Sequence, residues 1–243
     1  MRRHITLFKK REAFEFKYYL AILIFLFASI LLNKNLFAQS PYIANGLSYF
    51  QSTQSPEGYW GDASEVSYNS FVDTCYIAET FKYLNETGIS YPSAMQWINA
   101  TAVSNNDYLF TKMIVLAQAG FDVSTIRDYL LSIKNDDSGW GVTEGFESDV
   151  KRTALALQAL KSANYPDLSI MNYGLAYLAG AQNADGGWGG CKAADMGCSD
   201  TSNVYMTALV SITLQQFPQT TSIATAINKA TSHLIAHQNA DGG

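Results

Sequence analysis

Few residues of this chain have the spacing that catalysis or metal binding requires. His233 and His237 lie four residues apart and would share one helix face, but no third ligand lies nearby. A partly exposed helix face is the simpler interpretation of this pair. Asp136 and Asp137 lie just before the turn that ends in Trp140, where aspartate is a common turn residue. The sequence contains no G-x-S-x-G, H-E-x-x-H, P-loop or C-x-x-C pattern. We therefore expect no cofactor, and no catalytic residue is assigned.

Two of the three cysteines could form a disulfide bond. Cys191 and Cys198 lie in the Gly-rich loop GGCKAADMGCSD and could form a disulfide if the loop folds back. This loop, which also contains Asp195 and ends at Asp200, is the longest insertion at a turn and is therefore a candidate recognition site, and a stapled loop without a ligand is the alternative. Cys75 then remains alone, in a segment that predicts a buried helix.

Charge separates residues 1–38 from the rest of the 243-residue chain. The first 38 residues hold seven of the 16 Lys and Arg and two of the 21 Asp and Glu. The remainder therefore has nine basic and 19 acidic residues, a net charge of −10. An acidic body without a basic stripe argues against nucleic acid as a partner.

Residues 1–38 read as an export signal. Their basic start leads into fifteen uncharged, apolar residues, 18–32, and the small Ala38 precedes a plausible cleavage point. A membrane span needs about 20 residues. The segment is therefore predicted to be a signal peptide, with an uncleaved signal anchor as the alternative and as the chain's one expected contact with a membrane. Either reading predicts an exported, secreted, periplasmic or cell-surface protein.

The turn QNADGGWGG, residues 182–190, is one copy of a pattern that recurs along the chain. Residues 46–62, 126–142, 174–190 and 230–243 each combine an amphipathic stretch, Gln or Lys, and an Asp/Glu-Gly turn. The first three copies end in Trp-Gly, at Trp60, Trp140 and Trp188. Residues 93–107 form a degenerate unit that has lost its Gly-Trp. The fourth copy stops at Gly243 before its Trp, which predicts an array cut short.

A second motif follows each turn and predicts a helix. It has Thr, a small residue and an apolar run, at residues 73–84, 152–163 and 206–217, with 108–120 in the degenerate unit. Ala and Leu dominate, so we expect inner helices that are buried on all sides, with the more polar stretches forming an outer layer. Helical hairpins of this kind must stack on their neighbours. The prediction is an all-α fold of about nine helices over residues 39–243, arranged as an incomplete ring.

The motif of an apolar helix, Gln, a few residues, Gly, any residue and Trp resembles the QW motif of squalene-hopene and oxidosqualene cyclases. The same repeats occur in protein prenyltransferase β subunits and in many exported bacterial proteins. The resemblance covers about residues 42–243. It implies an α/α toroid of the terpenoid cyclase and protein prenyltransferase superfamily, with inner and outer helices alternating around an axis.

The resemblance also implies roles for the repeat residues. The glutamine side-chain carbonyl would satisfy free N–H groups at a helix start, and the tryptophan would pack against its amide. The residues that carry this structural motif are Gln54, Trp60, Trp140, Gln182, Asp185, Gly187, Trp188 and Gln238.

The same family suggests two chemistries, and the residues match neither in full. The Asp-x-Asp-Asp motif with which squalene-hopene-type cyclases start their reaction is absent, and the inner helices offer mostly Ala, Leu, Val, Ile and Thr. The segment 71–81 resembles the part of prenyltransferase β subunits that holds zinc, and Asp73 and Cys75 would be the ligands. No His follows in the next repeat, and Cys75 aligns with a small Ala in the other repeats. We therefore expect no metal site.

The sequence thus favours a noncatalytic binding or scaffolding module of an exported bacterial protein. Its partner would be a protein, lipid or glycan ligand that the sequence does not specify. A terpene cyclase or prenyltransferase-type enzyme acting on a polyisoprenoid is the alternative. A second alternative is an exported glycan-binding or glycan-degrading α/α barrel, because exposed aromatic side chains could stack on sugars.

Overall fold

The computed structural model describes residues 40–61, 68–192 and 199–241, and the regular elements in this part of the chain are helices joined by turns and loops. It contains α2 (Pro41–Thr53), α3 (Tyr68–Tyr83), α4 (Ser90–Ala100), α5 (Asn106–Gln118), α6 (Ser124–Ser132), α7 (Val150–Ser162), α8 (Leu168–Gly180), α9 (Val204–Gln215) and α10 (Thr221–Ala236). The predicted all-α fold is confirmed, with nine helices and no strand among the described residues.

The predicted export segment, residues 1–38, lies outside the described residues, so it stays a prediction. Each helix that the structure does describe is too short or too polar to cross a bilayer.

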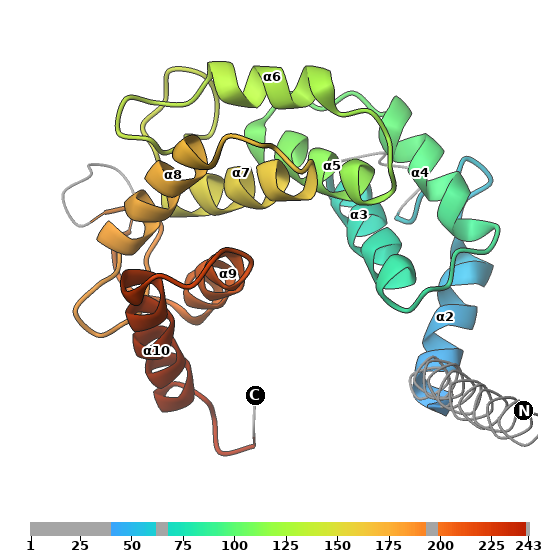
Figure 1. The fold of residues 1–243 in the computed structure, drawn as a ribbon. Coiled ribbons are helices and arrows are strands. Elements are labelled where there is room, and N and C mark those ends of the chain that lie inside the picture. Colours follow the sequence, from blue (N-terminus) through green and yellow to red (C-terminus); the bar gives the residue numbers. More distant parts are fainter. Residues whose placement is uncertain (1–39, 62–67, 193–198, 242–243) are drawn as a thin grey trace, which may run out of the picture.

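The helices alternate between two layers of an open arc (Figure 1). The inner layer is formed by α3, α5, α7 and α9, and the outer layer by α2, α4, α6, α8 and α10. Successive inner helices pack against each other, and each also packs against outer neighbours. The terminal helices α2 and α10 lie at the two ends of the arc. The described chain is therefore an incomplete ring, as predicted.

Three inner helices begin with a side-chain cap. The caps of α5, α7 and α9 are Asn105, Asp149 and Asn203, and each accepts a hydrogen bond from the backbone N–H three residues later. Such caps satisfy one of the free donors of a helix start and stabilise it by about 1 kcal/mol. The predicted helices began two residues too late at these places because the motif was aligned on Thr, which lies one turn inside the helix.

Each Gly-Trp turn joins an outer helix to the next inner helix through its tryptophan. The indole Nε1–H donates to an outer-helix carbonyl ten residues earlier, at 2.7–2.8 Å, with Phe50, Leu130 and Leu178 as acceptors. The backbone N–H donates to a threonine hydroxyl on the inner helix, at 3.0–3.1 Å, with Thr74, Thr153 and Thr207 as acceptors. The Thr of the sequence motif is thus the inner half of the Trp joint, which is defined here as these two bonds.

The side chains of Gln54 and Gln182 act as hydrogen-bond donors, whereas acceptors were expected. The Gln54 side chain donates its Nε2–H groups to a carbonyl of its own turn and to the Ser90 carbonyl of α4, both at 2.8 Å. Gln182 likewise donates to its own turn and to Ala226 in α10, at 2.9 and 2.8 Å. The expected acceptance of helix N–H bonds is wrong, because carbonyls face the amide here. Each glutamine therefore links one unit to the outer helix of the next.

Asp185 closes its own turn. Its Oδ1 atom accepts from the Gly187 N–H at 3.0 Å and from the Ser202 hydroxyl at 2.8 Å. The hydrogen bond from the Gly187 amide is the main reason that the pKa of Asp185 lies below its usual value. Gln238 follows α10 and is exposed, while Gly242 and Gly243 of the last copy lie outside the described residues.

The degenerate unit uses a lysine where the others use tryptophan. Lys112 of α5 donates to the carbonyls of Asn99 and Thr101 at the end of α4, at 2.9 and 2.7 Å. These carbonyls belong to the unpaired end of a helix, which a cation stabilises. Burial lowers the pKa of Lys112. The unit therefore keeps a link between its outer and inner helices after losing Gly-Trp.

The Trp joint predicts the effect of removing one hydroxyl. Thr153 is fully buried, and its Oγ1 accepts the Trp140 N–H. Thr153→Val leaves that buried donor without an acceptor, so we expect the free energy of unfolding to fall by about 1–3 kcal/mol. Thr153→Ser keeps the hydroxyl and loses one methyl group, about 0.8 kcal/mol. Urea unfolding followed by tryptophan fluorescence measures both. A Val variant as stable as the Ser variant would contradict the role of this bond.

Candidate functional site

All four inner helices contribute side chains to one hollow, with a volume of about 280 Å³. It lies on the face of the inner layer that the outer helices leave uncovered. Among the side chains that line it are Tyr76 and Glu79 from α3, Asp107 from α5, Lys151 and Gln158 from α7, and Tyr205 from α9. We call this hollow the inner groove.

The helical repeat explains why these side chains share one face. On α7, Lys151, Leu155 and Gln158 are spaced by four and three residues and line the groove. Ala154 and Leu157 between them are fully buried. The inner helices are therefore not buried on all sides, contrary to the expectation, because each presents one stripe to the groove.

Tyrosines form the exposed wall of the groove. Tyr76 is 56% exposed and Tyr205 is 57% exposed, although each belongs to an inner helix. Burial of its ring and the nearby Tyr205 both raise the pKa of Tyr76. The two rings therefore lie in one environment although they belong to α3 and α9. The expectation that the inner helices offer mostly Ala, Leu, Val, Ile and Thr, without an aromatic wall, is wrong at this face.

Glu79 brings a carboxyl group into the groove without a partner. Within the described part of the chain, its side chain makes neither a hydrogen bond nor an ion pair. Burial raises its pKa. Desolvation disfavours the charged form of a carboxyl group, so this side chain takes up a proton more readily than an exposed glutamate.

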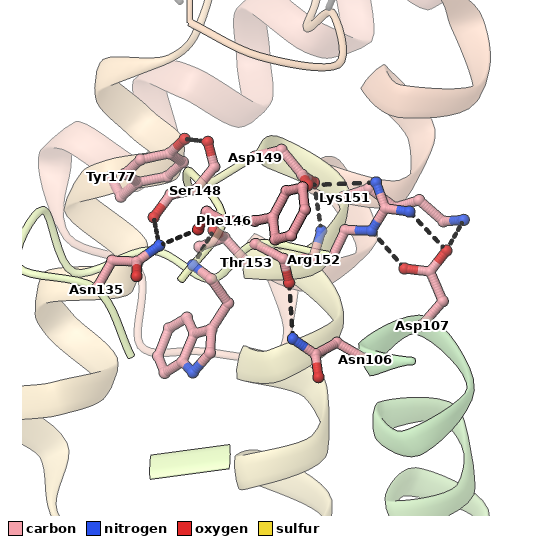
Figure 2. Close-up of polar contacts among 12 residues, drawn as sticks. Asn106, Asp107, Asn135, Phe146, Ser148, Asp149, Lys151, Arg152, Thr153 and Tyr177 are labelled. Carbon is pink, nitrogen blue, oxygen red and sulfur yellow. Dashed lines mark hydrogen bonds and ion pairs between the residues drawn. The ribbon is translucent and has the colours of Figure 1, made fainter. Parts of the chain in front are cut away.

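The charges at the α5–α7 side of the groove compensate one another (Figure 2). Asp107 binds Lys151 at 2.8 Å, and Arg152 donates to the same carboxylate, with Nη2 at 3.0 Å. Arg152 also binds Asp149 at 3.2 Å, and burial is the main cause of the raised pKa of Asp149. The cations of this cluster are therefore already engaged by carboxylates of the protein.

A second hollow of about 510 Å³ adjoins the groove. Tyr49 and Trp60 line it together with Asp73, and Tyr76 lines both hollows. Tyr49 is 63% exposed. Tyr76 is thus the residue that the two hollows share, and their lining side chains come from helices α2 to α9.

The two residues considered for zinc point to different environments. Asp73 is exposed and lines the second hollow, whereas Cys75 is fully buried in the core. Burial is the main cause of the strongly raised pKa of the Cys75 thiol, which keeps it in the form that binds metals poorly. Over the described ranges, no three His, Cys, Asp or Glu side chains come together in a way that could hold a metal ion.

The histidine pair differs from the expectation. His233 is only 4% exposed, and its ring stacks on His237 with centroids 4.1 Å apart. The expected partly exposed face is therefore wrong for His233, which packs beneath the turn that contains Gly187. Cys191 is buried, whereas Cys198 and Asp195 lie outside the described residues. The disulfide between Cys191 and Cys198 and the recognition role of this loop therefore stay predictions.

The chain is similar to part of a known enzyme. Squalene–hopene cyclase of Bradyrhizobium diazoefficiens is 28% identical over 160 residues, which cover 61% of this chain. The aligned part amounts to 19% of the cyclase, so the chain spans about a fifth of that relative. No protein-family profile matches the chain. The similarity supports a terpenoid cyclase-like relationship.

The groove predicts a pH-dependent effect of one substitution. Burial raises the pKa of Glu79 in the folded protein above its value in the unfolded chain. Above about pH 4, Glu79 therefore holds a proton more often in the folded than in the unfolded state, and the free energy of unfolding falls as the pH rises through this range. We expect Glu79→Gln to be more stable than the unsubstituted protein at pH 7 and equally stable near pH 4. Urea unfolding at both pH values tests this. Glu57→Gln, at an exposed position, is the control. A Glu79→Gln variant that is less stable than the unsubstituted protein at pH 7 would contradict the raised pKa of an unpaired Glu79.

Proposed function

We propose that this chain is a noncatalytic ligand-binding module of an exported bacterial protein, and that the inner groove is its binding surface. The observation that carries the proposal is the chemistry of the groove. Tyr76, Tyr205 and Glu79 face an accessible hollow, and no hydrogen bond to another described residue engages their side chains. Polar groups left uncommitted on a rigid helical scaffold are a feature of binding sites.

A terpene cyclase-type reaction is the second candidate, and two observations favour it. The chain is similar to part of a squalene–hopene cyclase, and Glu79 is a carboxyl group beside aromatic rings. Protonation of an alkene, however, requires a strong acid, and burial makes Glu79 a weaker one. Carbocations also require a site from which water is excluded, whereas Tyr76 and Tyr205 are more than half exposed. The groove therefore fits binding better than cyclisation.

Hydrolysis of a glycan fits the groove less well than binding. Glycosidases use two carboxyl groups that face each other across the scissile bond. The groove contains Glu79 and Asp107, and Asp107 is held by Lys151 and Arg152. Lys151 and Arg152 would therefore have to release this carboxylate before it could act on a glycosidic bond.

The export part of the proposal rests on the sequence of residues 1–38, with its basic start and its apolar run. An exported binding module would meet its ligand outside the cytoplasm or at the cell surface.

Incubation with squalene tests the noncatalytic role. We expect the purified exported protein to leave squalene unchanged, as judged by gas chromatography with mass spectrometry of the extract. A squalene–hopene cyclase assayed in parallel is the positive control. Formation of hopene by this chain, lost in Glu79→Gln, would overturn the proposal and assign Glu79 as the acid.

A further inference from the structure

We infer that the inner groove binds an uncharged oligosaccharide, with sugar rings stacked on Tyr76 and Tyr205. This inference rests on the proposed binding function and adds the chemical class of the ligand.

The aromatic surfaces have the form that a sugar ring requires. A pyranose has an apolar face of C–H groups and an edge of hydroxyl groups, and a tyrosine combines an apolar ring with a polar end. Tyr76 and Tyr205 each leave more than half of their surface accessible while their helices are packed in the inner layer. Rigid, exposed rings lose little conformational entropy when a ligand stacks on them.

The uncommitted polar groups match hydroxyl groups, which both donate and accept. Neither the Tyr76 nor the Tyr205 hydroxyl bonds to another described residue, and the Glu79 carboxyl group is similarly unpaired. Gln158 uses its Nε2–H for Thr213 at 2.7 Å, so its Oε1 atom is available as an acceptor. A ligand hydroxyl satisfies any of these groups, whether the group donates or accepts.

The charges favour an uncharged ligand. Lys151 is the cation that lines the groove, and Asp107 already binds it at 2.8 Å. An anionic ligand would have to displace this carboxylate and would lie near Glu79. A cationic ligand would lie near Lys151 and would find the carboxylate of Asp107 already paired.

Two other ligand classes fit less well. A polyisoprenoid would cover Glu79 and Gln158 with hydrocarbon and leave their polar atoms without partners, at a cost of about 1–3 kcal/mol for each group. An extended peptide presents N–H and C=O groups at a fixed repeat and needs a matching row of partners. The uncommitted groups here come from three helices, with Tyr76 and Glu79 on α3, Gln158 on α7 and Tyr205 on α9, and they do not follow one extended line.

The extent of the surface indicates more than one sugar ring. The 280 Å³ groove and the 510 Å³ hollow share Tyr76, and Tyr49 adds a third exposed ring beyond it. The carboxylate of Asp73 lines the outer hollow and can accept from further hydroxyl groups. An oligomer lying from α9 towards α2 would contact all three tyrosines.

Calorimetric titration of the purified exported protein tests the inference, with cellohexaose, maltohexaose and chitohexaose as uncharged probes. We expect at least one of them to bind. Tyr76→Ala and Tyr205→Ala should each weaken that binding about tenfold, the loss expected for one aromatic contact. Tyr173→Ala is the matched control, because Tyr173 on α8 is 63% exposed and lies outside both hollows.

The outcomes separate the ligand class from the binding function. Unfolding curves of each variant show whether it is folded, and Tyr76→Phe, which keeps the ring, should retain most of the affinity. Failure of all three saccharides to bind, or equal losses in Tyr173→Ala, would overturn the inference. Farnesol and an uncharged Gly-Ser-Asn peptide are titrated in parallel. Tyr76-dependent binding of either one without any saccharide would overturn the ligand class and leave the proposed binding function standing.

Discussion

The arc depends on the Trp joint, in which one buried tryptophan binds an outer helix through its indole and an inner helix through its backbone. Trp140 and Trp188 are fully buried, so water could not replace the partner of an indole or backbone N–H group if its hydrogen bond were lost. The joint thereby fixes the start of each inner helix relative to the outer layer. Since the groove is built from one stripe of each inner helix, its shape follows from these joints.

The sequence was sufficient to predict this scaffold. Repetition of the Gly-Trp turn and of the Thr-small-apolar motif predicted the helical hairpins, their two layers and an incomplete ring, all of which the described helices show. Both motifs are short and occur several times, so a misread residue in one copy does not change the helical hairpin that the other copies predict. Three inner helices start two residues earlier than predicted, after the caps Asn105, Asp149 and Asn203, and the inner helices are not buried on all sides.

The groove could not be predicted in the same way. The segment of Tyr76 mixes apolar and polar residues, and Tyr205 precedes the segment that was predicted as a helix. Composition does not show which stripe of a helix stays uncovered. That stripe depends on how α3, α5, α7 and α9 pack together, which is a property of the assembled arc. The spacing of Lys151, Leu155 and Gln158 by four and three residues was the available signal. The donor role of Gln54 was also out of reach, because its acceptor Ser90 belongs to another unit.

The central claim is that a scaffold similar to part of a terpene cyclase presents an open binding surface on its inner helices. The most direct measurement is a crystal structure of the protein grown with the hexasaccharide that binds most tightly. The account predicts electron density for a sugar ring against Tyr76, with a hydroxyl group within hydrogen-bonding distance of Glu79. Density for the saccharide on the outer helices, with the inner groove occupied only by water, would contradict it.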